Sequence, residues 1–220
     1  RMKTRASADL IRAAVSLRSV KEKIEISEIG KAVDIAYEMH VTAMKMCKPG
    51  VLEQKIFGIL EGIALSKGAG ISFPTILSIN GQTLHNHLHN NILKKGRMMV
   101  TDAGAETNLH YASDITRTTP VGGKFSRQQK EIYEIVLKAN VEAIKSAGPD
   151  KSNRDTHILA CRILASGLKD LKLLKGDIDE AVASGVHALF MPHGIGHMLG
   201  LDVHDMEALG ENHVGYNEKV

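Results

Sequence analysis

The sequence predicts an α+β layer architecture, in which helices and strands follow one another in blocks along the chain. Three observations support this fold class. Apolar residues recur at spacings of three and four in the first third of the chain. Short strand-like segments follow in the middle, at 71–79, 97–102 and 109–118. Helical periodicity returns from residue 126, and a glycine-rich extended stretch follows. The order helices, strands, helices, strands predicts two α-then-β halves that share one sheet.

The helices of the first half are placed by their caps and apolar stripes. Asp9 can cap a short helix over 10–17, and Ser27 can cap a longer one that ends before Pro49-Gly50. A third helix is expected over 51–67. The stripe of the long helix that we expect to face the core consists of Ile29, Ala32, Val33, Ala36, His40, Ala43 and Cys47.

The strands and the later helices are placed by turn residues and by periodicity. Pro74 predicts an edge or a bulge within 71–79, and Asn80-Gly81 predicts a turn. The segments 97–102 and 109–118 are expected to pair as a hairpin. Further helices are expected over 126–146, about 155–168 and about 178–184, with an extended stretch at 189–206. The apolar side of the first of these helices consists of Ile132, Ile135, Val136, Ala139 and Ile144.

Composition and charge exclude several classes of protein. The chain has 220 residues, 43% apolar and 24% charged, with a formal net charge of +3, which is ordinary for a soluble globular domain. It contains no apolar run long enough to span a membrane and no secretory signal. The small net charge and the aromatic content of 4% argue against a nucleic-acid partner and against a membrane partner. Cys47 and Cys161 form no CxxC pattern, so we expect buried thiols in a reducing, cytoplasmic compartment rather than a disulfide or a cysteine-based zinc site.

A pair of aspartates gives the first chemical signal. If the hairpin is centred on Asn108, Asp102 and Asp114 lie directly opposite each other, with Cβ atoms about 4.5–5.5 Å apart. Two carboxylates that close repel unless a shared proton or a cation lies between them. Carboxylates favour Mg or Mn, and an added imidazole moves the preference toward Mn, Fe, Co or Zn. The alternative is a pair of solvated aspartates that flank a turn.

Two windows of histidines give the second signal. His193 and His197 are four residues apart among glycines that disfavour a helix. On a strand they would lie roughly 13 Å apart, so at most one could bind a given ion. His204 adds a third imidazole within twelve residues. His85, His87 and His89 alternate, so an extended segment would place all three on one face, and we expect one of them to be functional. The remaining histidines, interpreted as structural or solvated, are His40, His110, His157, His187 and His213.

Three motifs together carry a resemblance to a known family. They are Val100–Glu106, Tyr111–Thr118 and His193–Asp205. From about residue 20 to 220 the chain resembles the pita-bread metallopeptidases, in the branch of the Xaa-Pro aminopeptidases (aminopeptidase P) and prolidases. The resemblance implies two αα-ββ halves around a curved, mostly antiparallel sheet. It also implies two divalent metal ions, usually Mn, with Zn, Co or Fe as alternatives, held by two Asp, one His and two Glu.

The resemblance assigns roles to individual residues. Asp102 matches the first aspartate ligand, Asp114 the aspartate that bridges the metals, and His197 the ligand histidine. The histidines that it places around the substrate are His85, near the scissile bond, His193, in the cleft, and His204, which stabilises the tetrahedral intermediate.

The sequence departs from the family pattern in two ways. Asp102 and Asp114 are 12 residues apart where many relatives show 11, and an extra residue at the hairpin tip would absorb the difference. The two glutamate ligands belong on later strands, and Glu207, Glu211 and Glu218 come too early to match them. We therefore expect 1–19 to lead in from a missing N-terminal domain. We expect 20–220 to be a catalytic domain that is truncated before its C-terminal strands and is inactive by itself, with its metal occupancy open.

The resemblance implies that the parent protein is an aminopeptidase. It would hydrolyse the bond between an N-terminal residue and a following proline, so its partner is a peptide with Pro at the second position, and a homodimer is allowed for. Three alternatives remain: a prolidase that cleaves Xaa-Pro dipeptides, a creatinase-like hydrolase without metal, and a non-catalytic binding module on the same fold. The retained Asp102, Asp114 and His197 argue against the creatinase-like alternative.

Overall fold

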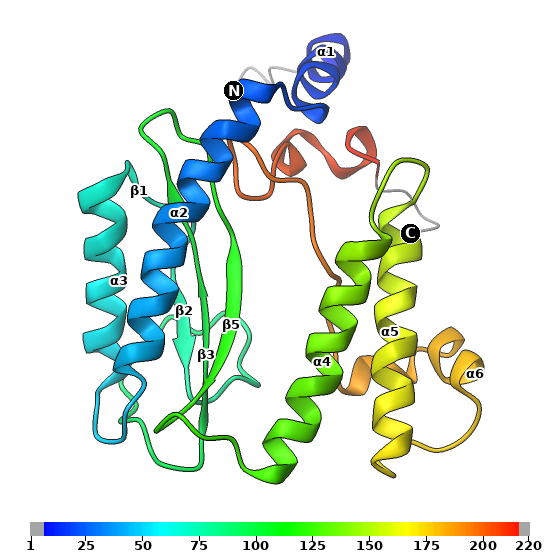
Figure 1. Cartoon of the computed structure of the whole chain (residues 1–220). Helices are drawn as coiled ribbons and strands as arrows, with labels where there is room; N and C mark the ends of the chain where they lie inside the picture. Colours follow the sequence, from blue (N-terminus) through cyan, green and yellow to red (C-terminus); the bar gives the residue numbers. More distant parts are fainter. Residues whose placement is uncertain (1–6, 216–220) are drawn as a thin grey trace, which may run out of the picture. The chain divides into compact units, whose positions relative to one another are not determined.

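The computed structural model describes residues 7–215, which fall into two compact units (Figure 1). The first unit comprises the chain up to Lys124 together with the segment from His197 onward, and the second comprises Phe125–Gly196. Part of the predicted lead-in and Glu218 lie outside the described residues. None of the helices in the described range is both long enough and apolar enough to cross a membrane.

The first unit begins with three helices, α1 (Ala8–Ser19), α2 (Lys23–Met46) and α3 (Glu53–Lys67). Two of the predicted caps are wrong, because both helices begin earlier. The Ser7 side chain accepts from the backbone N–H of Leu10 and caps α1, and Asp9 lies in the first turn, where a carboxylate favours the helix dipole. Glu22 forms a capping box with Glu25 at the start of α2, which leaves Ser27 inside the helix.

Five short strands complete the first unit. A three-stranded antiparallel sheet has the order β2 (Ile76–Ser78), β3 (Met98–Ala103), β5 (Ile115–Pro120). A second sheet pairs β1 (Gly70–Ile71) with β4 (Ala105–Glu106). The strand predicted over 71–79 is therefore split around Pro74, whose ring nitrogen cannot donate to a strand ladder. The turn after β2 is confirmed, because the Thr83 N–H bonds to the Asn80 carbonyl.

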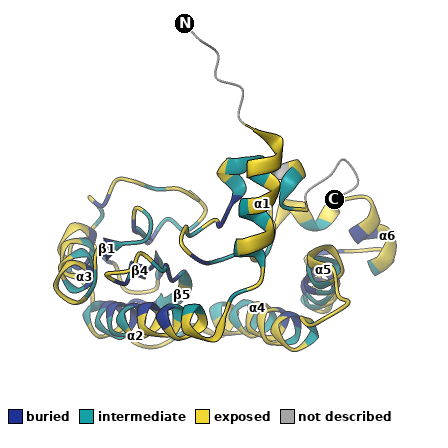
Figure 2. Ribbon diagram, turned by 90° about the horizontal axis from the view of Figure 1, so that it is seen from above, coloured by how far each residue is buried: buried dark blue, intermediate teal, exposed yellow. Residues whose placement is uncertain are grey.

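The core of the first unit lies between the helices and one face of the sheet. Figure 2 shows α2 lying along one side of the strands, with α3 beside them. Alternation along β3 buries Met99, Thr101 and Ala103 and leaves Asp102 on the other face. The residues that fill this core from the helices are Met39, Ala43, Ile56 and Leu60. Val33, predicted in the stripe of α2, is instead 38% exposed, because the buried face runs through Ala32, Ala36 and Met39.

The hairpin forms with a register two residues away from the prediction. Asp102 pairs with Thr116 and Ala103 with Ile115, so the ladder is centred on Leu109 and not on Asn108. The tip closes through the bond from the His110 N–H to the Thr107 carbonyl, with His110 at a positive φ of 62°. Asp114 therefore lies diagonally across from Asp102, two residues before Thr116 and on the same face of the sheet.

The regular secondary structure of the second unit, among its described residues, is helical. It contains α4 (Arg127–Ser146), α5 (Asn153–Asp170), α6 (Ile178–Ala183) and the 3-10 turn η1 (Val186–Leu189). Ser126 and Ser152 cap α4 and α5 through capping boxes, as their sequences favour. The core between them is lined by Ala139, Ala143, Ala160 and Leu164. Two residues predicted on the apolar side of α4 are exposed, Val136 at 52% and Ile144 at 68%, because small alanines make the close contact with α5.

The stretch 189–206 forms no strand. It is irregular and leads into two 3-10 turns of the first unit, η2 (Glu207–Leu209) and η3 (Glu211–His213). Its glycines include one at positive φ, Gly196 at 60°, which a regular strand would not accommodate.

Candidate metal centre

Two carboxyl groups meet on the open face of the three-stranded sheet. Asp102 projects from β3, and Asp114 immediately precedes β5. The two carboxyl groups lie within hydrogen-bonding reach of each other, and the Thr116 hydroxyl donates to Asp102 Oδ1 at 2.8 Å. The predicted aspartate pair is thus present, although through a diagonal contact and not a directly opposed one.

The aspartate pair holds a proton more tightly than isolated carboxylates do. Burial, together with the adjacent negative charge of Asp114, raises the pKa of Asp102 to about 6, against the hydrogen bond from Thr116. The site therefore keeps a proton between two carboxyl groups at mildly acidic pH. A divalent cation in that place would supply the same compensation.

His197 completes a contiguous set with the aspartates. Its Nε2 lies 3.0 Å from Asp114 Oδ2, and its Nδ1 lies 3.0 Å from the carbonyl oxygen of Met198. Because a carbonyl can only accept, Nδ1 carries a hydrogen, and the neutral ring would direct the lone pair of Nε2 at Asp114. The hydrogen bond to Asp114 accordingly raises the pKa of His197, and burial opposes it. The carbonyl fixes the tautomer in which Nε2 is free to bind a metal.

A pocket of about 310 Å³ opens beside these groups within the first unit. Its lining includes Pro74, His85, His87, Asp102, Asp114 and His204. The structure thus brings together four residues that the sequence analysis selected from segments far apart in the chain. His193 belongs to the second unit, so its assignment to the cleft stays a prediction.

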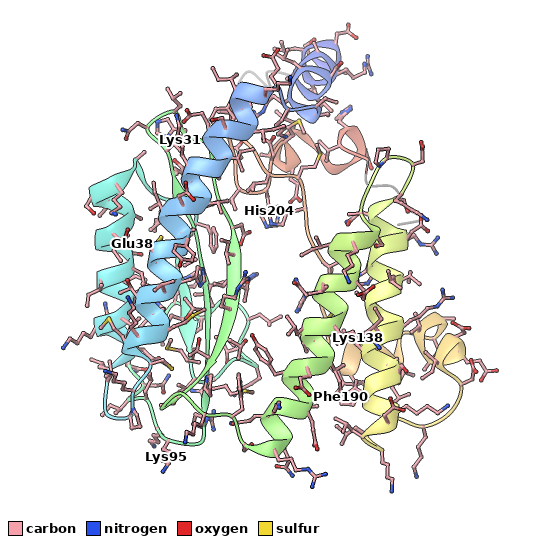
Figure 3. All side chains as sticks on the ribbon, in the orientation of Figure 1. Lys31, Glu38, Lys95, Lys138, Phe190 and His204 are labelled. Atoms are coloured by element: carbon pink, nitrogen blue, oxygen red, sulfur yellow. The ribbon has the colours of Figure 1, made fainter. Side chains whose placement is uncertain are left out.

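His204, which Figure 3 labels, makes contacts with two side chains. Its ring stacks on that of His197, with centroids 3.8 Å apart and planes 14° from parallel. Its Nδ1 lies 2.9 Å from Glu207 Oε2, which leaves Nε2 as the ring nitrogen available to a substrate. The sequence analysis considered Glu207 only as a mismatched metal ligand and missed this contact.

The three alternating histidines do not share one face, because their segment is irregular and not extended. His85 and His87 are exposed and line the pocket. His89 is 5% exposed, stacks on Phe57 with centroids 4.2 Å apart, and its Nδ1 lies 3.0 Å from the Leu77 carbonyl oxygen. His89 therefore anchors the segment, which turns the other two imidazoles toward solvent.

Two buried acidic residues that the sequence analysis missed hold the histidine-bearing segments. Glu53, fully buried, accepts from the backbone N–H of Ile79 at 2.7 Å and from Asn91 Nδ2 at 2.9 Å, on either side of His85. Asp205, 1% exposed, pairs with Lys21 Nζ at 2.7 Å and with the guanidinium of Arg18. The role of Asp205 could have been predicted from its place directly after His204. Glu53 lies in the first turn of a helix, where an acidic residue is common, so its sequence position did not indicate burial.

The donor set fits divalent metal ions. Two carboxylates and one imidazole with a fixed tautomer are ligands typical of Mn, Fe, Co and Zn. The carbonyl of Met198 behind His197 and the hydroxyl of Thr116 beside Asp102 are outer contacts of the kind that orient metal ligands. Asp102, Asp114 and His197 are therefore the residues that would hold the metal.

Comparison with known proteins identifies the family. Residues 27–219 match the model of metallopeptidase family M24. The chain is 38% identical over 199 residues to the Xaa-Pro aminopeptidase of Escherichia coli K12, covering 89% of this chain and 45% of that protein. The structure of E. coli aminopeptidase P with the inhibitor Pro-Leu superimposes with a TM-score of 0.86 at 36% identity, over 94% of this chain and 48% of that one. The structure of the Pseudomonas aeruginosa aminopeptidase PepP superimposes with a TM-score of 0.82 at 35% identity, over 86% of this chain and 43% of that one.

The chain belongs to metallopeptidase family M24. Its fold is the pita-bread fold of aminopeptidase P, as the sequence predicted. It spans about half the length of the relatives it matches. Family membership implies divalent metal ions, in agreement with the donor set of Asp102, Asp114 and His197.

Proposed function

We propose that the protein to which this chain belongs is an aminopeptidase that hydrolyses the bond between an N-terminal residue and a following proline. The observation that supports it is the pocket in which Asp102, Asp114, His85 and His204 converge within a family M24 fold. The similar proteins named Xaa-Pro aminopeptidase favour this substrate class over other peptides.

We propose that the metal ions are two Mn²⁺, held by Asp102, Asp114 and His197 together with two glutamates that have no counterpart at the expected spacing in this sequence. Bound divalent ions lower the pKa of a water molecule and polarise the scissile carbonyl. The 220-residue chain is proposed to be inactive by itself, because the ligand set is incomplete without those glutamates.

The residues of this chain bind and orient the substrate. The exposed imidazole of His85 contacts the peptide near the scissile bond. His204, with Nδ1 bound to Glu207 and its ring stacked on His197, presents Nε2 to the oxygen that becomes negative during hydrolysis. His193 is proposed to line the same cleft. A cytoplasmic location and a homodimer complete the proposal.

The test is release of the N-terminal residue from an Xaa-Pro-Yaa peptide, with added Mn²⁺ or with chelator. It compares the 220-residue chain with a longer chain that supplies the two glutamates. We expect Mn-dependent cleavage by the longer chain only. The cleavage should be lost in the Asp114→Asn variant of that chain. It should be retained in the control variant Asp9→Asn, which alters a carboxylate that is 91% exposed. Cleavage of Xaa-Pro dipeptides alone would indicate a prolidase. Full metal content in Asp114→Asn would contradict the ligand assignment, and neither metal nor cleavage would indicate a binding module.

A further inference from the structure

A second cluster of metal-binding side chains lies within the helical unit. His157 and Cys161 are four residues apart on α5, so they lie on the same face of that helix. His187 reaches the same point from η1, which begins after Gly185 in a left-handed conformation with φ of 76°. One ligand atom from each of these three residues lies within 4.8 Å of the others. The sequence analysis interpreted both histidines as structural or solvated and the cysteine as a buried thiol.

The cluster leaves buried polar atoms without partners. The Nδ1 atoms of His157 and His187 are both buried, and neither has a hydrogen-bond partner among the described residues. Ring nitrogens without partners in a protein interior cost free energy, so these two imidazoles do not serve to complete a hydrogen-bond network among the described residues. Nothing in the packing requires two imidazoles here, since the surrounding core is made of apolar residues: Ile158, Ala165, Ile178, Val182 and Met191.

The distances are close to those of a tetrahedral metal site. Cys161 Sγ lies 3.4 Å from His157 Nε2. In a tetrahedral zinc site, with Zn–S of about 2.3 Å and Zn–N of about 2.0–2.1 Å, the sulfur and nitrogen ligands are about 3.5 Å apart. The three ligand atoms all lie within 4.8 Å of one another, so shifts of about 1 Å or less would bring them to tetrahedral separations.

The surroundings of His157 and Cys161 keep these two side chains uncharged before a metal binds. Burial lowers the pKa of His157, and the neighbouring His187 and His193 lower it further, so its ring is neutral and able to bind a metal at physiological pH. Burial raises the pKa of the Cys161 thiol. Binding of a cation would therefore form a sulfur–metal bond and release the thiol proton to solvent.

We propose that His157, Cys161 and His187 form a second metal site that takes Zn²⁺, with water in the fourth position. One thiolate and two imidazoles are softer ligands than the carboxylates of the first unit and favour Zn²⁺ over Mn²⁺. The site is built entirely from residues of the second unit. It is therefore independent of the ligands Asp102, Asp114 and His197.

The test uses Co²⁺ as a spectroscopic substitute for Zn²⁺ on the reduced 220-residue chain under anaerobic conditions. A thiolate bound to Co²⁺ gives a charge-transfer band in the near ultraviolet, which the sulfur-free Asp102, Asp114 and His197 set cannot produce. We expect this band in the unmodified chain, release of one proton for each thiolate bound, and loss of the band when one equivalent of Zn²⁺ is added.

Three variants assign the band to its ligands. It should be lost in Cys161→Ser and retained in Cys47→Ser, which changes the other buried thiol. His187→Ala should weaken Co²⁺ binding by more than about tenfold, since even loss of an outer contact to a metal ligand costs that much. Far-ultraviolet circular dichroism checks that each variant is folded. A folded, reduced chain without the band would overturn the proposal, as would a band that persists in Cys161→Ser.

Discussion

The raised pKa of Asp102 makes the stability of the metal-free protein depend on pH in an unusual direction. The ordinary pKa of this carboxyl is 3.8, and in the folded chain it is about 6. Between these values the folded state holds a proton that the unfolded state has lost, so the free energy of unfolding falls as the pH rises. The stabilisation is complete below the ordinary value and is lost as the pH rises through about 6.

The magnitude follows from the same two values. A difference of about two pH units corresponds to up to about 3 kcal/mol, at about 1.4 kcal/mol per unit. Asp102→Asn removes the titration and keeps an oxygen that can accept from Thr116. At pH 8, with chelator present, we therefore expect the variant to be more stable than the unmodified chain by as much as about 3 kcal/mol. At pH 4 we expect the two to be similar.

The assay is urea denaturation with chelator at a series of pH values from 4 to 8, in which the difference between the two proteins is taken at each pH. Groups that do not contact Asp102 cancel in this difference. They include His197, whose raised pKa contributes stability that is lost only as the pH rises beyond the ordinary imidazole value. The difference in free energy of unfolding between Asp102→Asn and the unmodified chain should change between pH 4 and pH 8. If it stays constant within about 0.5 kcal/mol, burial and the Asp114 charge do not hold the proton, and the reasoning is wrong.

Three further predictions concern metal binding and the framework of the pocket. Metal affinity of the first site should fall as the pH is lowered through about 6, because Asp102 must lose its proton to bind, and calorimetric titration of the longer chain with Mn²⁺ at several pH values measures it. Asp205→Asn should destabilise the chain by about 3–5 kcal/mol in chemical denaturation, because it leaves the cations of Arg18 and Lys21 facing a buried neutral group. An effect below about 1 kcal/mol would mean that these ion pairs are solvated. Gly104→Ala should destabilise strongly, because its Cβ would lie 1.8 Å from the Ser113 carbonyl oxygen, whereas Gly30→Ala, with nothing within 4 Å, should be neutral or stabilising by thermal denaturation.

Several elements of the fold were predictable from a period and a cap in the sequence, although the caps of α1 and α2 were placed wrongly. The helix over 126–146 was placed within one residue, because Ser126 and Gln129 form a capping box before a periodic run. The strand pairing was also predictable, but its register was not. The centre moved from Asn108 to Leu109 because His110, and no glycine, takes the left-handed position that closes the tip. That conformation follows from the fold around the turn and has no strong local signal.

The candidate site was predictable in its residue types and not in its geometry. The aspartates could be paired from the sequence because they belong to one hairpin. Histidines on irregular segments offer no period, so nothing local could show that His85 and His87 face the pocket while His89 is buried. The cluster of His157, Cys161 and His187 depends on how η1 returns to α5, which is a tertiary contact that spacing alone does not reveal.

The pocket combines a regular sheet with irregular segments, and the two are held in different ways. Asp102 is fixed by the β3 ladder, whereas His85 and His204 lie on segments that have no ladder of their own. A buried carboxylate is stable only when its oxygens have partners. Glu53 bonds to the segment around His85, and Asp205 pairs with Arg18 of α1 and with Lys21. Because the two anchors share no partner, loosening one should displace one histidine and leave the other in place. The positions of His85 and His204 at the pocket are therefore set by two separate buried acidic residues and not by the sheet.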